Sequence, residues 1–140
     1  MRFVLDCSVA MSWCFSDEAD DYSDTVLDFL VDSEALVPSI WPLEVANVLV
    51  MAERRKRINE AQTMRLVELL ESLPLVVDAS TPDRAMGPIL SLVREHQLSA
   101  YDAAYLELAM REGLPLATRD DKLTKAARSC GVVRLERKES

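Results

Sequence analysis

The sequence contains little cysteine, glycine and histidine, and these shortages narrow the class of protein. Its 140 residues include three cysteines, three glycines and one histidine. The cysteines stand at positions 7, 14 and 130, an odd number without C-x-x-C spacing. This argues against a disulfide framework and a zinc-ribbon site and favours a reducing compartment. Few glycines and 29% charged residues argue against a fibrous or disordered chain.

Long apolar runs are also lacking. The first run, Phe3-Val4-Leu5, is interrupted by Asp6 well before it could form the core of a signal peptide. No stretch approaches the roughly 20 uncharged apolar residues that a membrane span requires. We therefore expect a soluble, cytoplasmic protein without a membrane segment. Because domains of about 100–150 residues are the commonest, we expect residues 1–140 to form a single domain.

Apart from Arg2, positive charge is absent from the first third of the chain. No Lys or Arg stands between Phe3 and Glu53, whereas four basic residues occupy 54–57 and others gather after residue 118. The formal net charge of −8 argues against nucleic-acid binding, because phosphate affinity usually comes from basic surface. A chain that separates its charges can still bind phosphate on one side. Net charge alone therefore does not decide the substrate.

Short apolar runs alternate with longer amphipathic segments along the chain. The expected strands are residues 2–6, 36–38, 75–77, 114–117 and 132–135. The expected helices are residues 9–15, 18–32, 42–57, 59–73, 81–95, 99–111 and 120–130, with a kink or break at Gly87-Pro88. Strands that alternate with helices predict an α/β fold. We expect three α/β/α layers around a central, mostly parallel five-stranded sheet.

Four acids lie near the expected carboxyl ends of the strands, where ligands bind in open parallel sheets. Asp6 ends the first strand, and Asp120 follows the fourth. Glu44 and Asp102 each lie near the start of a mostly apolar helix. The fold would therefore bring carboxylates from four distant parts of the chain to one rim of the sheet.

Each of these acids also has an ordinary structural explanation. Asp6 can cap the next helix, as Asp often does. Ser99 with Asp102, and Thr118 with Asp121, fit the spacing of a capping box. Taken one at a time, the acids are better explained by helix capping or the helix dipole than by chemistry. The case for a site depends on their coming together.

Two of the helices favour a site over capping. Glu44 suits a helix dipole, but it shares a helix face with Val48 and Met51, and Asp102 shares one with Leu106. No Arg or Lys lies at helical spacing in either helix interior to pair with these acids. Unpaired buried carboxylates are costly, so the cluster implies raised pKa values or a bound divalent cation. Oxygen ligands without His or thiolate select Mg²⁺ or Mn²⁺.

Four short motifs occur in order over nearly the whole chain. They are Val4-Leu5-Asp6-Cys7-Ser8-Val9 with Trp13, then Glu44-x-x-Asn47, then Leu98-Ser99-x-Tyr101-Asp102-Ala103-x-Tyr105, and last Leu116-Ala117-Thr118-x-Asp120-x-x-Leu123. Each is weak alone, but together they are specific. The sequence resembles the PIN domain, and within it the VapC-type ribonuclease toxins of bacterial toxin–antitoxin pairs.

The resemblance implies an endoribonuclease that depends on Mg²⁺ or Mn²⁺. It implies that the metal pocket is formed by Asp6, Glu44, Asp102 and Asp120. It also implies supporting roles beside these ligands for the Ser8 and Thr118 hydroxyls and for Asn47. Asp121 stands next to Asp120, so either acid of the doublet can face the metal, and the family spacing from Thr118 favours Asp120. A homodimer, neutralised by a small antitoxin protein, is implied as well.

RNA phosphates would then be contacted by basic side chains near the rim. Arg119 and Lys122 are the best candidates, and residues 54–57 have an equally good explanation as a solvated helix end. The apolar side of segment 17–34 is most simply core, with an antitoxin groove as its alternative.

Two other functions remain open from the sequence. A catalytically silent PIN-like chain would act only as a binding module. A phospho-receiver domain would use Asp78, at the end of the third strand, as its phosphoryl acceptor. Against that interpretation, the first strand ends in one acid rather than a pair, and no Lys-Pro follows the fifth strand.

Overall fold

A parallel sheet of four strands runs through the centre of the computed structural model, which describes residues 1–137. The strands are β1 (Arg2–Leu5), β2 (Glu34–Pro38), β3 (Leu75–Asp78) and β4 (Leu116–Ala117), in the order β3-β2-β1-β4. Every pairing is parallel. The two central strands are buried along almost their whole length, as in sheets covered on both faces. The expected α/β fold is confirmed.

The segment expected as a fifth strand, residues 132–135, forms only a single parallel bridge, between Leu116 and Arg134. The backbone N–H of Leu116 donates to the carbonyl of Val133 at 3.0 Å, and that of Leu135 donates to the carbonyl of Leu116 at 2.8 Å. The segment therefore lies along β4, where a fifth strand was expected. Because β4 is two residues long, a longer ladder cannot form.

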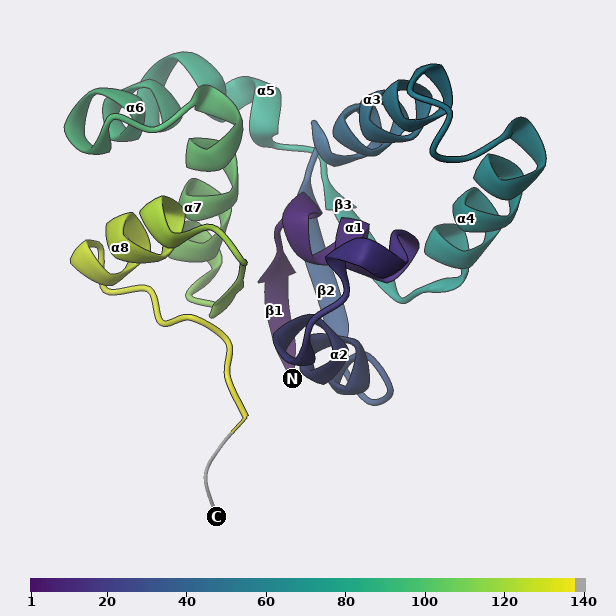
Figure 1. Cartoon of the computed structure of the whole chain (residues 1–140). Helices are drawn as coiled ribbons and strands as arrows, with labels where there is room; N and C mark the ends of the chain where they lie inside the picture. Colours follow the sequence, from purple (N-terminus) through teal and green to yellow (C-terminus); the bar gives the residue numbers. More distant parts are fainter. Residues whose placement is uncertain (138–140) are drawn as a thin grey trace.

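Helices lie on both sides of the strands. They are α1 (Cys7–Cys14), α2 (Asp21–Phe29), α3 (Trp41–Arg54), α4 (Glu60–Ser72), α5 (Thr81–Arg84), α6 (Leu90–His96), α7 (Ala100–Glu112) and α8 (Asp121–Ser129), with a 3₁₀ turn η1 (Ser16–Glu18) and a π-helical segment η2 (Ala85–Ile89). Figure 1 shows α6 to α8 on one side of the strands and α1 to α4 on the other, which gives the expected three layers. Among residues 1–137 no helix is both long and apolar enough to cross a membrane.

The expected helix over residues 81–95 is divided by η2. Pro88 lies inside this π-helical segment. Proline lacks an N–H and its ring clashes with the carbonyl one turn earlier, so an α-helix cannot pass through it unchanged. The expected kink or break at Gly87-Pro88 is therefore a local widening of the helix, with α5 before it and α6 after it.

Helix α7 is the central packing element on its side of the sheet. The hydroxyl of Ser99 caps it by accepting from the N–H of Asp102 at 3.1 Å, and Gly113 ends it with a φ of +66°. Tyr105, Leu106 and four other α7 residues from 103 to 109 are buried hydrophobic groups of the core. The cap at one end and the apolar face together fix where the first turn of α7, which carries Asp102, lies against the sheet.

The apolar side of α2 is also part of the core. Val26 and Leu30 are buried, and Tyr22 and Phe29 pack against the core cluster. The simpler interpretation of this helix is confirmed.

A partly buried ion cluster fastens α7 to α5 and to the edge strand β3. The Arg111 guanidinium lies 2.8 Å from Asp78 and 3.1 Å from Glu107, and Arg84 lies 3.0 Å from Glu107. Glu107, which interrupts the apolar sequence of α7, is thus paired although its side chain is only 5% exposed.

Candidate metal centre

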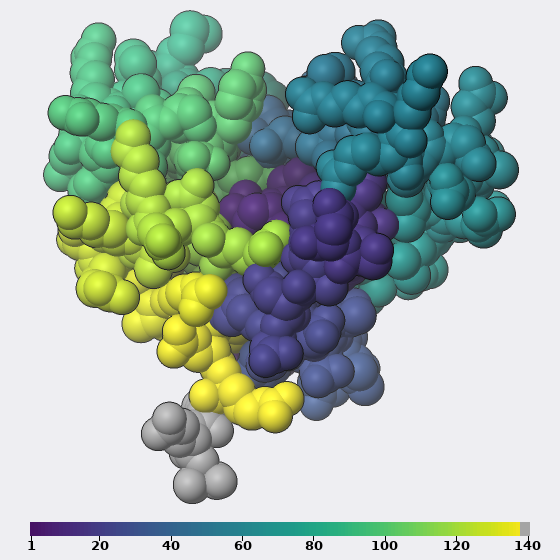
Figure 2. All heavy atoms as spheres, viewed as in Figure 1, coloured from purple at the N-terminus to yellow at the C-terminus, as the bar shows by residue number. Residues whose placement is uncertain are grey.

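The four candidate acids lie on elements around the carboxyl end of β1. Asp6 directly follows β1, Glu44 lies in the first turn of α3, Asp102 lies in the first turn of α7, and Asp120 is the N-cap of α8. Figure 2 shows a hollow between the blue-teal part of the surface (α3 and α4) and the green part (α5 to α7), with purple atoms from the start of the chain at its floor. The helices that carry Glu44 and Asp102 thus face each other across the place where β1 ends.

Asp6 is the most enclosed of these acids. It is 5% exposed, and its Oδ2 accepts hydrogen bonds from Oγ of Ser8 and Oγ1 of Thr118, both at 2.8 Å. It occupies the N-cap position of α1 but makes no capping hydrogen bond, so helix capping does not explain it. Burial raises the pKa of Asp6, the two hydroxyls act in the opposite direction, and the charge of Asp120 adds to the rise.

The turn between β4 and α8 is tied to Asp6 through the same two hydroxyls. Oγ1 of Thr118 accepts from the N–H of Asp120 at 3.0 Å, and Oγ of Ser8 accepts from the N–H of Arg119 at 3.3 Å. Asp120 in turn accepts from the N–H of Leu123 at 2.8 Å and so caps α8. The second carboxylate oxygen of Asp120 accepts no hydrogen bond from residues 1–137.

Glu44 is held by a tyrosine from the opposite wall of the hollow. The hydroxyl of Tyr105 donates to its Oε1 at 2.6 Å. Burial raises the pKa of Glu44, the tyrosine hydrogen bond opposes that rise, and the charges of Asp6 and Asp102 add to it. Tyr105 belongs to one of the family motifs, but sequence reasoning gave it no role. The available signal was its spacing, three residues after Asp102 and therefore on the same side of the helix.

Asp102 has a half-buried carboxylate without a hydrogen-bond partner of good geometry in the described chain. Its N–H donates to Ser99, but the return bond that would complete a capping box is absent there. Burial raises its pKa, and the charges of Asp6 and Asp120 raise it further, while Ser99 and the charge of Lys122 act in the opposite direction. The capping explanation accounts for Ser99 and not for the carboxylate of Asp102.

The acids are not neutralised by basic side chains. Within residues 1–137, no Arg or Lys forms an ion pair with Asp6, Glu44 or Asp102. The acids raise one another's pKa, they are at least partly buried, and they offer oxygen donors. This combination fits the ligand chemistry of a hard divalent cation. As placed, however, no three His, Cys, Asp or Glu side chains of the described residues are grouped closely enough to hold an ion. The donor chemistry fits Mg²⁺ or Mn²⁺, and the ligand geometry is not preformed.

Two of the candidate supporting residues lie at the surface. Asn47 is exposed on α3, one turn after Glu44, and Asp121 is exposed as the first residue of α8. Neither side chain makes a hydrogen bond to the described residues. Asp120, not Asp121, is the acid of the doublet whose charge acts on Asp6 and Asp102.

The candidate phosphate contacts differ in how they are engaged. Arg119 pairs with Asp20 at 2.7 Å, so its guanidinium is already occupied. Lys122 is exposed near the start of α8 and lowers the pKa of Asp102. In the basic run 54–57, Arg57 pairs with Asp17 at 2.9 Å. Lys122 is therefore the candidate whose charge already acts on the acids.

Asp78 is engaged in a way that contradicts a role as phosphoryl acceptor. Both of its carboxylate oxygens accept from Arg111, at 3.3 and 2.8 Å. It also ends β3, an edge strand separated from β1 by β2. The phospho-receiver interpretation is therefore wrong for this chain.

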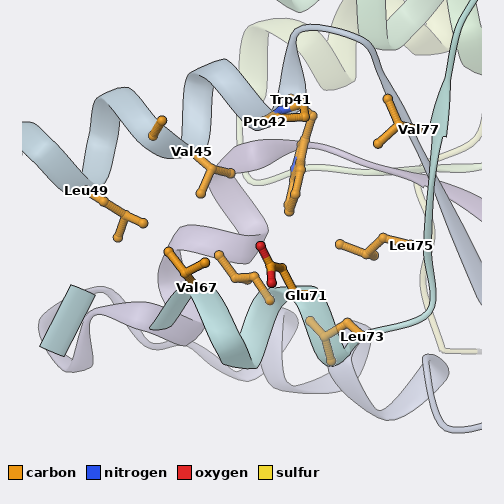
Figure 3. A pocket seen from close by; sticks show the side chains of 11 residues that line it. Trp41, Pro42, Val45, Leu49, Val67, Glu71, Leu73, Leu75 and Val77 are labelled. Atoms are coloured by element: carbon orange, nitrogen blue, oxygen red, sulfur yellow. The ribbon is translucent and has the colours of Figure 1, made fainter. Parts of the chain in front are cut away.

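A separate apolar groove lies between α3, α4 and β3. Figure 3 shows Trp41, Val45 and Leu49 of α3 facing Val67 of α4, with Leu75 of β3 beside them. Its volume is about 410 Å³, and Glu71 is the charged residue in its lining. The groove contains none of the four acids.

Comparison with protein families matches residues 3–129 to the PIN domain. Among solved structures, PAE2754 from Pyrobaculum aerophilum is similar with a TM-score of 0.67 and 22% identity over 96% of this chain and 83% of that one. VapBC2 from Rickettsia felis, bound to a DNA fragment from their promoter, has a TM-score of 0.67 and 14% identity, and the match covers 96% of this chain and 98% of that one. A toxin–antitoxin complex from Klebsiella pneumoniae has a TM-score of 0.59 and 19% identity, and the match covers 87% of this chain and 89% of that one. Comparison with curated proteins gives no match.

Proposed function

The chain belongs to the PIN domain family, and on that premise we propose that it is an endoribonuclease, dependent on Mg²⁺ or Mn²⁺, that acts as the toxin of a toxin–antitoxin pair. One observation carries the proposal. Asp6, Glu44 and Asp102 lie around the end of β1 with raised pKa values and without an ion-pair partner in the described chain. Such a group is costly unless a cation is bound among its members.

The proposed metal ligands are Asp6, Glu44, Asp102 and Asp120. A bound Mg²⁺ or Mn²⁺ ion supplies an activated water and offsets the charge of the scissile phosphate. Ser8 and Thr118 hold Asp6 in one orientation by bonding the same carboxylate oxygen. Because they donate to Oδ2, Oδ1 is the oxygen left for other contacts. Asp120 is likewise bonded through Oδ1 alone.

RNA is the proposed substrate, and Lys122 is its best-placed phosphate contact. The acids would repel RNA unless a cation is bound, so phosphate binding and metal binding are expected to be coupled. Lys122 is exposed on α8, one turn or less from Asp120. Arg119 would have to leave Asp20 before it could contact a phosphate. We therefore expect Lys122 to contribute more to RNA binding than Arg119.

The test is RNA cleavage by the purified chain. We expect cleavage with Mg²⁺ or Mn²⁺ and none with a chelator. Asp6→Asn and Asp102→Asn each remove a proposed ligand and are expected to lower the rate by at least about 100-fold, since the metal supplies several kcal/mol of transition-state stabilisation. Asp121→Asn, an exposed neighbour, is the matched control and should cleave as the wild type does.

Two results would contradict the proposal. Unchanged cleavage by Asp6→Asn or Asp102→Asn would remove these residues from the site. Wild-type protein that binds Mn²⁺ at these acids but cleaves no RNA would favour the silent binding module instead.

A small antitoxin protein is the proposed partner, and the groove of Figure 3 is its proposed binding site. The support is the fold shared with the Klebsiella pneumoniae toxin–antitoxin complex and the apolar lining of the groove, which suits the apolar face of an amphipathic segment. Co-expression with a candidate antitoxin encoded beside this gene should give a stable complex and no cleavage. Val67→Glu should weaken the complex and restore cleavage. A complex of unchanged stability would contradict the groove as the antitoxin binding site.

A homodimer is proposed on the family resemblance. Light scattering of the purified chain checks it, and a monomer at working concentration would contradict it.

A further inference from the structure

Tyr105 links the two walls of the hollow at the place where the acids meet. It lies on α7 and is completely buried, and its hydroxyl reaches Oε1 of Glu44 on α3, 61 residues earlier in the chain. Asp102 stands three residues before it on the same helix. A single helix thus brings one acid to the site and holds a second acid from the facing wall.

The hydrogen bond between Tyr105 and Glu44 is a strong one. Hydrogen bonds from a hydroxyl to a carboxylate have lengths of about 2.5–2.7 Å and are about twice as strong as neutral ones. The observed separation is 2.6 Å. The phenol group also lies near enough to Asp6 for the charge of that carboxylate to raise the pKa of Tyr105. Tyr105 is therefore at the site itself and not merely in the core behind it.

The hydrogen bond distinguishes the two oxygens of Glu44. Oε1 is occupied by the tyrosine hydroxyl, whereas Oε2 accepts no hydrogen bond from residues 1–137. A glutamate side chain has three rotatable bonds, and ordering it for a ligand costs conformational entropy. A fixed donor on Oε1 removes part of that cost before a ligand arrives.

We propose that Tyr105 is a positioning residue of the metal site, which holds Oε1 of Glu44 so that Oε2 is the oxygen presented to the cation. The inference depends on the proposed function, because it requires that Glu44 be a metal ligand. Groups that orient metal ligands typically contribute 10- to 100-fold to metal affinity. Removing the hydroxyl should therefore weaken metal binding without removing a ligand.

The test measures the Mn²⁺ affinity of the full chain. The electron paramagnetic resonance signal of free Mn²⁺ gives the unbound concentration in the titration. Tyr105→Phe should raise the dissociation constant by about 10-fold, and Glu44→Gln should raise it at least as much. The double variant should bind no more weakly than Glu44→Gln alone, because Tyr105 acts through Glu44. Leu108→Val, a buried change on the same helix, controls for loosening of α7 and should leave the affinity unchanged.

The outcomes separate the two claims. Equal affinities of wild type and Tyr105→Phe, or effects of Tyr105→Phe and Glu44→Gln that add, would overturn the positioning role and leave the metal site intact. Absence of Mn²⁺ binding by the wild type would overturn both.

A second measurement needs no substitution at Tyr105. In protein carrying ¹³C-labelled tyrosine, the ring carbon that bears the hydroxyl of Tyr105 should change its chemical shift when Mg²⁺ is added. The corresponding carbon of Tyr22, whose hydroxyl donates to the backbone of Leu135, should not. An unchanged Tyr105 signal at saturating Mg²⁺ would also overturn the positioning role.

Discussion

At the scale of single residues, burial and neighbouring negative charge both make the ionised form of three carboxylates less favourable. Burial raises the pKa of Asp6, Glu44 and Asp102, and the charge of at least one other acid of the group raises each further. Hydrogen bonds from hydroxyls and from the backbone of Ser8, together with the charge of Lys122, act against these shifts. The folded chain without a cation is therefore less favourable for the ionised acids than the unfolded chain is.

That difference predicts how the stability of the metal-free chain depends on pH. A carboxyl whose pKa is higher in the folded state binds more protons there than in the unfolded state, so stability falls as pH rises from the ordinary pKa of about 4 through the raised value. Asp102→Asn removes this effect. In chelator, the variant should have the higher urea midpoint at pH 7, and the difference should shrink toward pH 4.

Asp121→Asn is the control for the pH prediction, since this exposed acid should show no such gain. An Asp102→Asn midpoint that is equal to or below that of the wild type at pH 7 would contradict the assigned penalty.

Positions in the site were predictable where they follow from strand ends, and contacts were not. Asp6 and Asp120 follow strands, and parallel strands end at one edge, so their meeting follows from the alternation of elements. The hydrogen bond from Tyr105 to Glu44 and the ion pair between Arg119 and Asp20 join residues 61 and 99 positions apart. No periodicity encodes such pairs, which depend on how the helices pack in three dimensions.

At the scale of elements, the position of α7 decides the geometry of the site. It carries Asp102 and Tyr105, and it is fastened at its far end by the ion cluster around Arg111. Removing one partner of a buried ion pair leaves a charge without compensation. The cluster thus stabilises the helix that carries two of the site residues.

Arg111→Met tests this at nearly constant side-chain length. It leaves Asp78 without its partner and Glu107 with Arg84 alone, so we expect a loss of about 3 kcal/mol in the free energy of unfolding. Urea denaturation measures it. Arg2→Met breaks an exposed pair with Glu34 and should cost no more than about 1 kcal/mol. Equal losses in the two variants would contradict a structural role for the cluster.

The elements themselves were predictable to within a few residues, and the differences have local causes. Segment 132–135 has the composition of a strand, but a ladder extends no further than its shorter strand, and β4 offers two residues. The sequence marks Gly87-Pro88 as an interruption, whereas its form as a π-helical segment depends on the packing of α5, η2 and α7.

At the scale of the whole molecule, sheet order gathers the acids. With β1 between β2 and β4 and all strands parallel, the elements after these three strands start at the same edge. Asp6, α3 with Glu44 and the turn to α8 with Asp120 all follow from that order, and α7 packs against β1 and β2 from the side. The order of the strands and the packing of α7 thus place the four acids around one edge of the sheet.

The location of a bound Mn²⁺ ion tests the account most directly. Crystals of the wild-type chain grown with MnCl₂ should show an anomalous scattering peak within ligand distance of Asp6 and Asp102, with Oε2 of Glu44 turned toward it. The same experiment with Asp6→Asn should show a weaker peak or none. A wild-type structure with saturating Mn²⁺ and no peak at these acids, or with the peak elsewhere, would contradict the central claim that they form a cation site.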